Sequence, residues 1–162
     1  MAKLATGAPV ADMGWRVPKE PPGWTVLSEE PGLLSYRVES RCTVLLAQPM
    51  LPSGVRGSAA FARDGIRQVG ELLKVDQAAA ETIESTGTML AAAVRGLSRT
   101  VSIPFAGVRT HFPDVQVTAQ VYGYASGKIG VIVTALCRDD ALDTLERAIR
   151  PQLTRLVVTM QF

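Results

Sequence analysis

The segment from Val115 to Cys137 constrains the fold of this chain more than any other part of its sequence. It reads VQVTAQVYGYASGKIGVIVTALC, two strand-like stretches joined by a short turn around Ser126 and Gly127. The first stretch alternates polar and apolar residues, whereas the second, from Ile129 onward, is apolar almost throughout. Alternation is typical of a strand with one buried face, and a continuous apolar run of a strand buried on both faces. The segment therefore predicts a β-hairpin within a sheet, and something must cover its second face.

The turn sets which residues of this hairpin share a face. A two-residue loop at Ser126-Gly127 and a four-residue loop from Ala125 to Lys128 predict the same register. The core-facing pairs are then Val117 with Leu136, Ala119 with Thr134, and Val121 with Ile132. The opposite face pairs Tyr122 with Val131, Gln120 with Val133, and Tyr124 with Ile129. A slip of one residue would exchange the two faces.

The size and charge of the chain limit its architecture and its partners. It has 162 residues, of which 47% are hydrophobic and 20% charged, a composition that indicates a folded domain with its own core. Seventeen lysines and arginines against fifteen acidic residues give a net charge of +2, and the arginines are scattered. Because nucleic-acid-binding proteins usually carry a dense basic face, we expect no nucleic-acid partner.

The N-terminal residues and the cysteines favour a cytoplasmic protein. The opening MAKLATGAPVADMGW is interrupted by Gly7, Pro9 and Asp12, unlike a secretory signal, and has no cysteine to accept a lipid. No apolar run reaches the roughly 20 residues that cross a bilayer, so we expect no membrane span. Cys42 and Cys137 are interpreted as buried reduced thiols, with a disulfide as the alternative if their strands are neighbours.

Proline content separates an N-terminal arm from the rest of the chain. Residues 1–23 contain four prolines, which remove backbone donors and disfavour both helix and central strand. We expect Trp15 of this arm to dock on the surface of the chain's own domain. Residues 24–162 are expected to form a single α+β domain.

The first part of that domain is expected to contain three strands. Pro31-Gly32 joins the first two, placing Leu27 opposite Tyr36 and Thr25 opposite Val38. A Pro-Gly turn twists strands in the wrong sense for a tight hairpin, so we expect a bulge nearby. The third strand, residues 42–48, is apolar on both faces, which is typical of the middle of a sheet.

Two segments with helical signals follow. Ser58 is expected to cap a helix that ends at Lys74 and carries one apolar stripe. Alanines favour helix in residues 76–97, but Ser85–Thr88 interrupts them and is also consistent with the start of a strand, so residues 76–100 are left open between helix and strand.

The C-terminal part is expected to contain a short strand, a loop and a helix. The strand TVSIPF closes at Pro104, and a loop then runs to Asp114 before the hairpin. A last helix begins at Asp139 or Asp140, either of which can cap it, and is expected to kink at Pro151.

Few residues are arranged for catalysis or cofactor binding. The sequence has no dinucleotide or P-loop pattern, no cysteine–histidine cluster at metal-ligand spacing, and no GxSxG motif. The single histidine, His111, lies in GVRTHFPD and is interpreted as a solvated or turn residue rather than a catalytic base. We therefore expect no enzyme, no cofactor and no metal site.

The second face of the hairpin is the remaining functional signal. It combines tyrosines with valines, and a tyrosine ring packs against apolar groups while its hydroxyl stays hydrated. Left exposed, such a face would bury a protein partner or a second copy of the chain. The alternative is that the arm or residues 76–97 cover it. The expected partner-binding residues are Gln120, Tyr122, Tyr124, Val131 and Val133.

The order of these elements resembles that of the PsbP-like α/β group, in particular its bacterial DcrB-like branch. The likeness spans most of Pro22 to Arg150, and rests on PPGW before the first hairpin, the apolar third strand, the helix that ends at Lys74, AQVYGYASGKIGVIVTALC and the closing helix. It implies an antiparallel sheet packed against helices, and a non-enzymatic binding domain. Members of the group serve as assembly factors, envelope-associated proteins and dimeric chaperones of secreted effectors. The resemblance transfers no binding residue.

Three functional hypotheses remain, of which we favour the first. It is a non-catalytic and dimeric protein-binding domain, an adaptor or secretion-type chaperone that buries an apolar effector segment on the sheet face. The second is a small-molecule binder or enzyme that uses His111 or Arg109 in a pocket between sheet and helices. The third is a structural or immunity-type protein that blocks a cognate partner.

Overall fold

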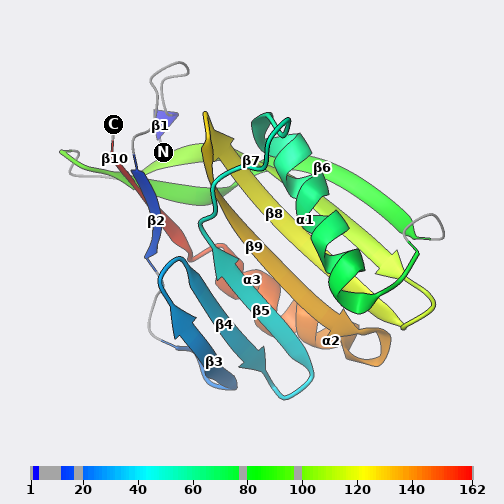
Figure 1. Cartoon of the computed structure of the whole chain (residues 1–162). Helices are drawn as coiled ribbons and strands as arrows, with labels where there is room; N and C mark the ends of the chain where they lie inside the picture. The colour runs from blue at the N-terminus through cyan, green and yellow to red at the C-terminus, as the bar shows by residue number, and fades with distance from the viewer. Residues whose placement is uncertain (1, 4–11, 17–19, 77–79, 97–99, 162) are drawn as a thin grey trace.

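The computed structural model describes residues 2–3, 12–16, 20–76, 80–96 and 100–161, and the strands among them form one curled ten-stranded sheet (Figure 1). The strand order is β2-β10-β6-β7-β8-β9-β5-β4-β3, and β1 pairs with β7 off this path. The strands are β1 (Ala2–Lys3), β2 (Asp12–Arg16), β3 (Trp24–Glu30), β4 (Leu33–Val38), β5 (Cys42–Ala47), β6 (Glu81–Val94), β7 (Thr100–Phe112), β8 (Val117–Ser126), β9 (Ile129–Arg138) and β10 (Val157–Gln161).

The α+β class is confirmed, but the sheet is mixed rather than purely antiparallel. β10 runs parallel to β6, and β1 runs parallel to β7. The parallel pairing of β10 arises because helical residues 139–153 carry the chain across the sheet before β10 joins it.

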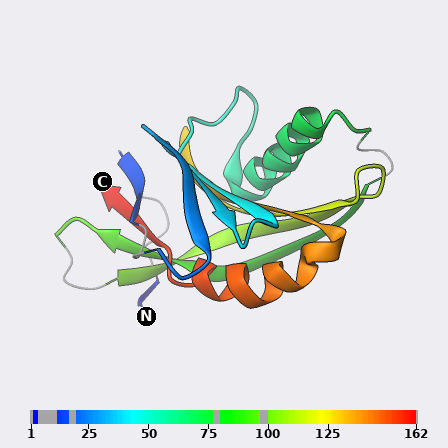
Figure 2. The ribbon, with the colours of Figure 1, turned by 90° about the horizontal axis from the view of Figure 1, so that it is seen from below.

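Helices cover the two faces of the sheet. Figure 2 shows α1 (Gly57–Leu73) on one face and, on the other, a helical stretch that we term the C-terminal helical segment, residues 139–153. It consists of the 3₁₀ turn η2 (Asp139–Ala141), α2 (Leu142–Thr144), the π-helical turn η3 (Leu145–Ile149) and α3 (Arg150–Leu153). Each helical layer buries its own apolar cluster against the sheet. The sheet therefore has a hydrophobic core on each face, and β7, β8 and β9 contribute side chains to both cores.

The β8–β9 hairpin forms as expected, with a register two residues away from the expected one. Ala119 pairs with Leu136 and Tyr122 with Val133, because Ser126 pairs with Ile129 and the two turn residues are Gly127 and Lys128 rather than Ser126 and Gly127. An even shift keeps every side chain on its expected face.

The first three strands also follow the sequence. The bulge expected near the Pro-Gly turn is confirmed: the β3–β4 register shifts between Val26 and Ser28, so Thr25 lies opposite Arg37 rather than Val38. β5 lies between β4 and β9, as its two apolar faces indicate.

The two cysteines differ from expectation. Cys42 on β5 and Cys137 on β9 lie directly opposite each other and form a disulfide, so the interpretation as reduced thiols is wrong. The alternative interpretation, a disulfide, is confirmed, because β5 and β9 are neighbours in the sheet.

Of the two structures left open for residues 76–100, residues 81–94 form strand, β6, rather than the helix that the alanines favour. Alanine's helix preference amounts to less than about 1 kcal/mol per residue, and pairing overrides it: β7 pairs along most of β6, and β10 pairs with Ala91–Val94. The loop expected after Pro104 is also strand, since β7 continues to Phe112. Pro104 is tolerated because it lies opposite the register shift between Gly87 and Leu90, where the ladder is already interrupted.

The chain ends also join the sheet. Trp15 on β2 packs at the core and donates its indole N–H to the Ala47 carbonyl at 3.0 Å, which confirms the expected docking of this residue. The kink expected at Pro151 takes the form of the π-helical turn just before it, which widens the helix where the proline ring would clash. Among the described residues, no helix is long and apolar enough to span a bilayer.

Neither expected cap forms. The Ser58 hydroxyl instead accepts a hydrogen bond from the Ala125 backbone N–H at 3.0 Å, and Asp139 accepts one from the Thr118 hydroxyl at 3.2 Å. Both side chains therefore connect a helix to the sheet.

Candidate functional site

The five residues expected to contact a partner lie inside the molecule. Their exposed fractions are low: Gln120 6%, Tyr122 3%, Tyr124 9%, Val131 0% and Val133 0%. The expectation that the second hairpin face is exposed is therefore wrong. Met13 and Trp15 of the arm, and Ala92 and Val94 of β6, belong to the same apolar cluster as this face.

The C-terminal helical segment covers this face. Leu145, Ile149 and Leu153 are buried in the same apolar cluster as Tyr122 and Val131. Burial raises the pKa of the Tyr124 hydroxyl. The sequence contained the apolar helical stripe that does this, but only the path of the chain after β9 shows which sheet face it meets.

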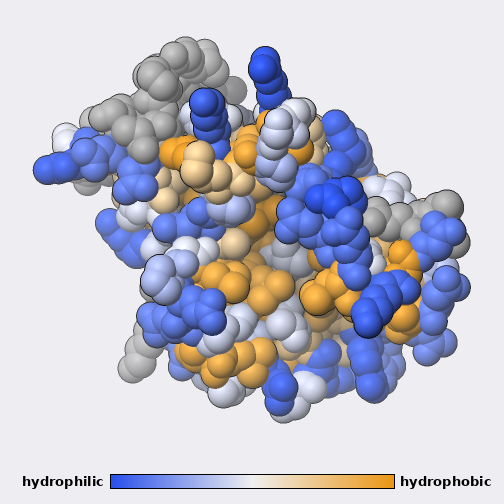
Figure 3. Space-filling model, in the orientation of Figure 1, coloured by the Kyte–Doolittle hydropathy of each residue, from blue (hydrophilic) through white to orange (hydrophobic). Residues whose placement is uncertain are grey.

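The α1 side of the molecule offers no continuous apolar platform either. Figure 3 shows its hydrophobic side chains in separate groups interrupted by hydrophilic ones. The remaining candidate sites are cavities and sheet edges.

His111 and Arg109, the residues of the second hypothesis, line one cavity of about 510 Å³ beside the start of the C-terminal helical segment. Arg109 Nη2 donates to Glu146 Oε1 at 2.9 Å. His111 Nδ1 lies 3.3 Å from both Asp139 Oδ1 and Thr118 Oγ1. The expectation that His111 is a solvated or turn residue is wrong, since it lies on β7 and is partly buried.

This cavity is better suited to binding than to catalysis. Thr118 and Asp139 both contact the Nδ1 side of His111, whereas a hydroxyl–histidine–carboxylate relay needs its partners on different ring nitrogens. Arg109 Nε is buried without a hydrogen-bond partner among the described residues, and Ile83 and Leu142 are the apolar residues that line the cavity. Within the described ranges, no group of three or more potential ligand residues is arranged to hold a metal ion.

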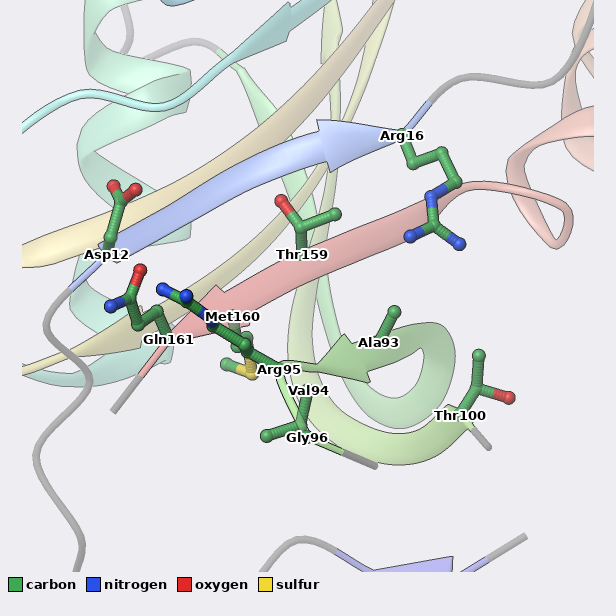
Figure 4. A pocket seen from close by; sticks show the side chains of 10 residues that line it. All are labelled: Asp12, Arg16, Ala93, Val94, Arg95, Gly96, Thr100, Thr159, Met160 and Gln161. Carbon is green, nitrogen blue, oxygen red and sulfur yellow. The ribbon is translucent and has the colours of Figure 1, made fainter. Parts of the chain in front are cut away.

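A second cavity, of about 480 Å³, opens on the face of β2, β10 and β6, and is called the hollow below (Figure 4). Arg16 on β2, Arg95 at the end of β6 and Thr159 on β10 line it, with Asp12 at its rim. No sequence motif marks it, because its residues come from three separate parts of the chain.

One edge of the sheet is open. β10 pairs with β6 only at Ala91–Val94, and none of the other described strands pairs with the outer side of Glu81–Thr86. Figure 1 shows this part of β6 as the outermost strand on its side of the sheet. All six residues are exposed, and Ile83 is 70% exposed. We call these residues the open edge of β6.

Comparison with known proteins bears on the fold. No protein-family model and no curated protein sequence matches the chain. Among solved structures, it is similar to the solution structure of cyanobacterial PsbP (CyanoP) from Synechocystis sp. PCC 6803, with a TM-score of 0.50 and 12% identity. The match covers 94% of this chain and 96% of that chain.

The fold of this chain is PsbP-like. The resemblance drawn from the order of elements is thus confirmed for the fold. At 12% identity the similarity shows the fold alone and assigns no role to any residue of this PsbP-like chain.

Proposed function

We propose that this PsbP-like chain is a non-catalytic protein-binding domain whose partner is a second copy of itself, paired along the open edge of β6. The observation that carries this proposal is the exposed stretch Glu81–Thr86, whose outer side pairs with none of the other described strands. An exposed strand edge presents backbone donors and acceptors that another strand can pair with.

The side chains of the open edge suit pairing with themselves. Antiparallel pairing about a twofold axis through Ile83 places this residue opposite its own counterpart. Glu81 then lies opposite Ser85 of the second copy, and Thr82 opposite Glu84. Each carboxylate thus faces a hydroxyl rather than a like charge, and the exposed isoleucines cover each other. β10 limits the pairing, because it occupies the same side of β6 from Ala91 onward.

The chaperone form of the first hypothesis has less support. Holding an effector segment against Tyr122 and Val131 requires the C-terminal helical segment to leave the sheet and to expose its buried Leu145, Ile149 and Leu153. Burial of each such side chain is worth roughly 1.5–3 kcal/mol. Edge pairing needs no such opening.

Sedimentation of the full chain and cysteine cross-linking test the proposal. The wild-type chain should sediment as a dimer, and Ile83→Asp as a monomer. Under mild oxidation Ile83→Cys should form a disulfide-linked dimer, because directly opposite Cα atoms lie about 4.5–5.5 Å apart, within disulfide reach.

Glu81→Cys is the matched control. In the proposed register its counterpart lies four residues away, roughly 13 Å along the strand, and should not cross-link. A wild-type monomer at high concentration would refute the proposal. A dimer in which Glu81→Cys cross-links as readily as Ile83→Cys would place the contact elsewhere.

The His111 cavity supports a second candidate function, the binding of a small molecule. The supporting observation is that both residues of the second hypothesis line one cavity together with the unpartnered Arg109 Nε. In a thermal-shift screen of small organic ions, a true ligand should raise the Tm of the wild-type chain and not that of His111→Ala. A ligand that shifts both proteins equally binds elsewhere.

The disulfide bears on the compartment in which the chain works. Disulfides persist mainly in oxidising compartments and are rare in the cytosol. The Cys42–Cys137 bond supports residence in an oxidising compartment, in place of the cytoplasmic location expected from the sequence.

A further inference from the structure

A row of small residues crosses neighbouring strands and forms the floor of the hollow. Thr159 on β10 pairs with Gly14 on β2 and with Ala93 on β6, and Ala93 pairs in turn with Thr100 on β7. Directly paired residues project from the same face of a sheet. Gly14 has no side chain, and those of Thr159, Ala93 and Thr100, which line the hollow, are short, so the surface is depressed there.

Two arginines flank this floor. Arg16 pairs with Val157, two positions before Thr159 and on the same face. Arg95 lies two positions after Ala93, and its backbone N–H donates to the Met160 carbonyl at 3.0 Å. Figure 4 shows the two guanidinium groups on opposite sides of Thr159.

Neither guanidinium has a hydrogen-bond or ion-pair partner among the residues that the structure describes. By contrast, Arg147 binds both carboxylate oxygens of Glu39, at 2.8 and 2.9 Å. Each guanidinium carries five N–H donors in a planar fork that matches oxyanions. The hollow thus presents two guanidinium groups without a partner among the described residues, over a floor with the hydroxyls of Thr159 and Thr100.

We infer that the hollow binds a small soluble phosphate or phosphomonoester, held between Arg16 and Arg95 over Thr159. Asp12 offsets one of the two positive charges, which leaves the lining with a net charge of +1. Two forks that approach from different sides suit a tetrahedral oxyanion, which offers oxygens in several directions, better than a planar carboxylate. The volume of about 480 Å³ lies within the range of small-molecule sites. This site is separate from the open edge of β6 and does not depend on dimer formation.

Calorimetric titration of the full chain with inorganic phosphate tests the inference. Arg16→Gln and Arg95→Gln should each weaken phosphate binding about tenfold or more, and the double variant should show none, because hydrogen bonds from a charged fork are among the strongest in proteins. Arg37→Gln is the matched control: Arg37 is exposed on β4, far along the sheet, and should bind phosphate like the wild type.

A steric variant separates the hollow from a general charge effect. Ala93→Leu fills the floor without changing any charge and should abolish phosphate binding, whereas Ala59→Leu, on the exposed side of α1, should not. Circular dichroism checks that each variant is folded. If Ala93→Leu does not fold, the titrations of Arg16→Gln and Arg95→Gln still test the inference, because both arginines are exposed.

Three results would overturn the inference. One is the absence of phosphate binding by the wild-type chain. Another is an equal loss in Arg37→Gln and in Arg16→Gln, which would indicate unspecific attraction. The third is binding to vesicles of phosphatidate in phosphatidylcholine with none to free phosphate, which would identify a lipid surface rather than a small soluble ligand.

Discussion

The ring of Phe61 on α1 packs directly on the backbone of Gly130 on β9. A Cβ atom at position 130 would lie 2.6 Å from Phe61 Cε2 and 3.0 Å from the Tyr124 carbonyl oxygen. This contact brings α1 close to the sheet at the end of the β8–β9 hairpin, and it leaves no room for any side chain.

Gly130→Ala should therefore destabilise the chain. Overpacking of a filled core typically costs about 1–3 kcal/mol, and the free energy of unfolding from urea titration should fall by this amount. In a Phe61→Leu background the smaller side chain can move away from position 130, so Gly130→Ala should lower the free energy of unfolding by less than in the wild type. An equal cost in both backgrounds would show that the ring does not set the limit.

Val131→Asp should unfold the chain or nearly so. Val131 is 0% exposed beneath the C-terminal helical segment, and burying an unpaired carboxylate is among the most destabilising single changes. A loss of more than about 3 kcal/mol is expected in urea titration.

Ile83→Asp is the control for Val131→Asp, because it also replaces a β-branched apolar side chain with aspartate, but at an exposed strand position. At a concentration where the chain is monomeric, its free energy of unfolding should stay within about 0.5 kcal/mol of wild type. Near-native stability of Val131→Asp would mean that the hairpin face is accessible after all, and would revive the chaperone hypothesis.

The Cys42–Cys137 disulfide should contribute strongly to stability. It links positions 95 residues apart, and closing so long a loop restricts the unfolded chain. The double variant Cys42→Ala/Cys137→Ala should lose about 2–4 kcal/mol of unfolding free energy. Reductant should lower the urea midpoint of the wild type and leave that of the double variant unchanged. If alkylation without reduction modifies both cysteines of the folded wild type, the bond is not formed.

Acid should weaken the contact between Glu39 and Arg147, which ties the β4–β5 turn to the C-terminal helical segment. The hydrogen bonds from Arg147 lower the pKa of Glu39. Because the folded-state pKa lies below the unfolded value, the stabilising contribution is present above the unfolded pKa and is lost as pH falls through the folded one. The urea midpoint of the wild type should therefore fall more between pH 7 and pH 3 than that of Glu39→Gln.

Glu30→Gln serves as the control for this pH effect, since Glu30 is an exposed β3 carboxylate with no hydrogen bond among the described residues. Its midpoint should follow that of the wild type at both pH values. An identical pH response of Glu39→Gln and Glu30→Gln would rule out a role for the Arg147 contact.

Local patterns in the sequence were sufficient for much of the fold. The alternation from Val115 onward predicted the β8–β9 hairpin, and the two apolar faces of Cys42–Ala47 predicted a central strand. The Pro-Gly turn predicted the bulge between Val26 and Ser28. These features depend on neighbours within a few residues, so a single chain segment contains their cause.

The sequence pattern failed where distant segments meet. Residues 81–94 carry helix-favouring alanines, yet pairing with β7 and β10 makes them strand. The apolar second face of the hairpin is visible in the sequence, but its cover, Leu145 to Leu153, reaches it only through the path of the chain.

By itself, then, the sequence determined the α+β class, the central hairpin and its two apolar faces, because side-chain periodicity expresses them locally. Only the tertiary structure decided that both faces are covered, that Cys42 meets Cys137, and that an unpaired strand edge and a hollow between two arginines remain at the surface. Burial and charge pairing at these places depend on side chains from remote segments, whose proximity is a property of the packed sheet.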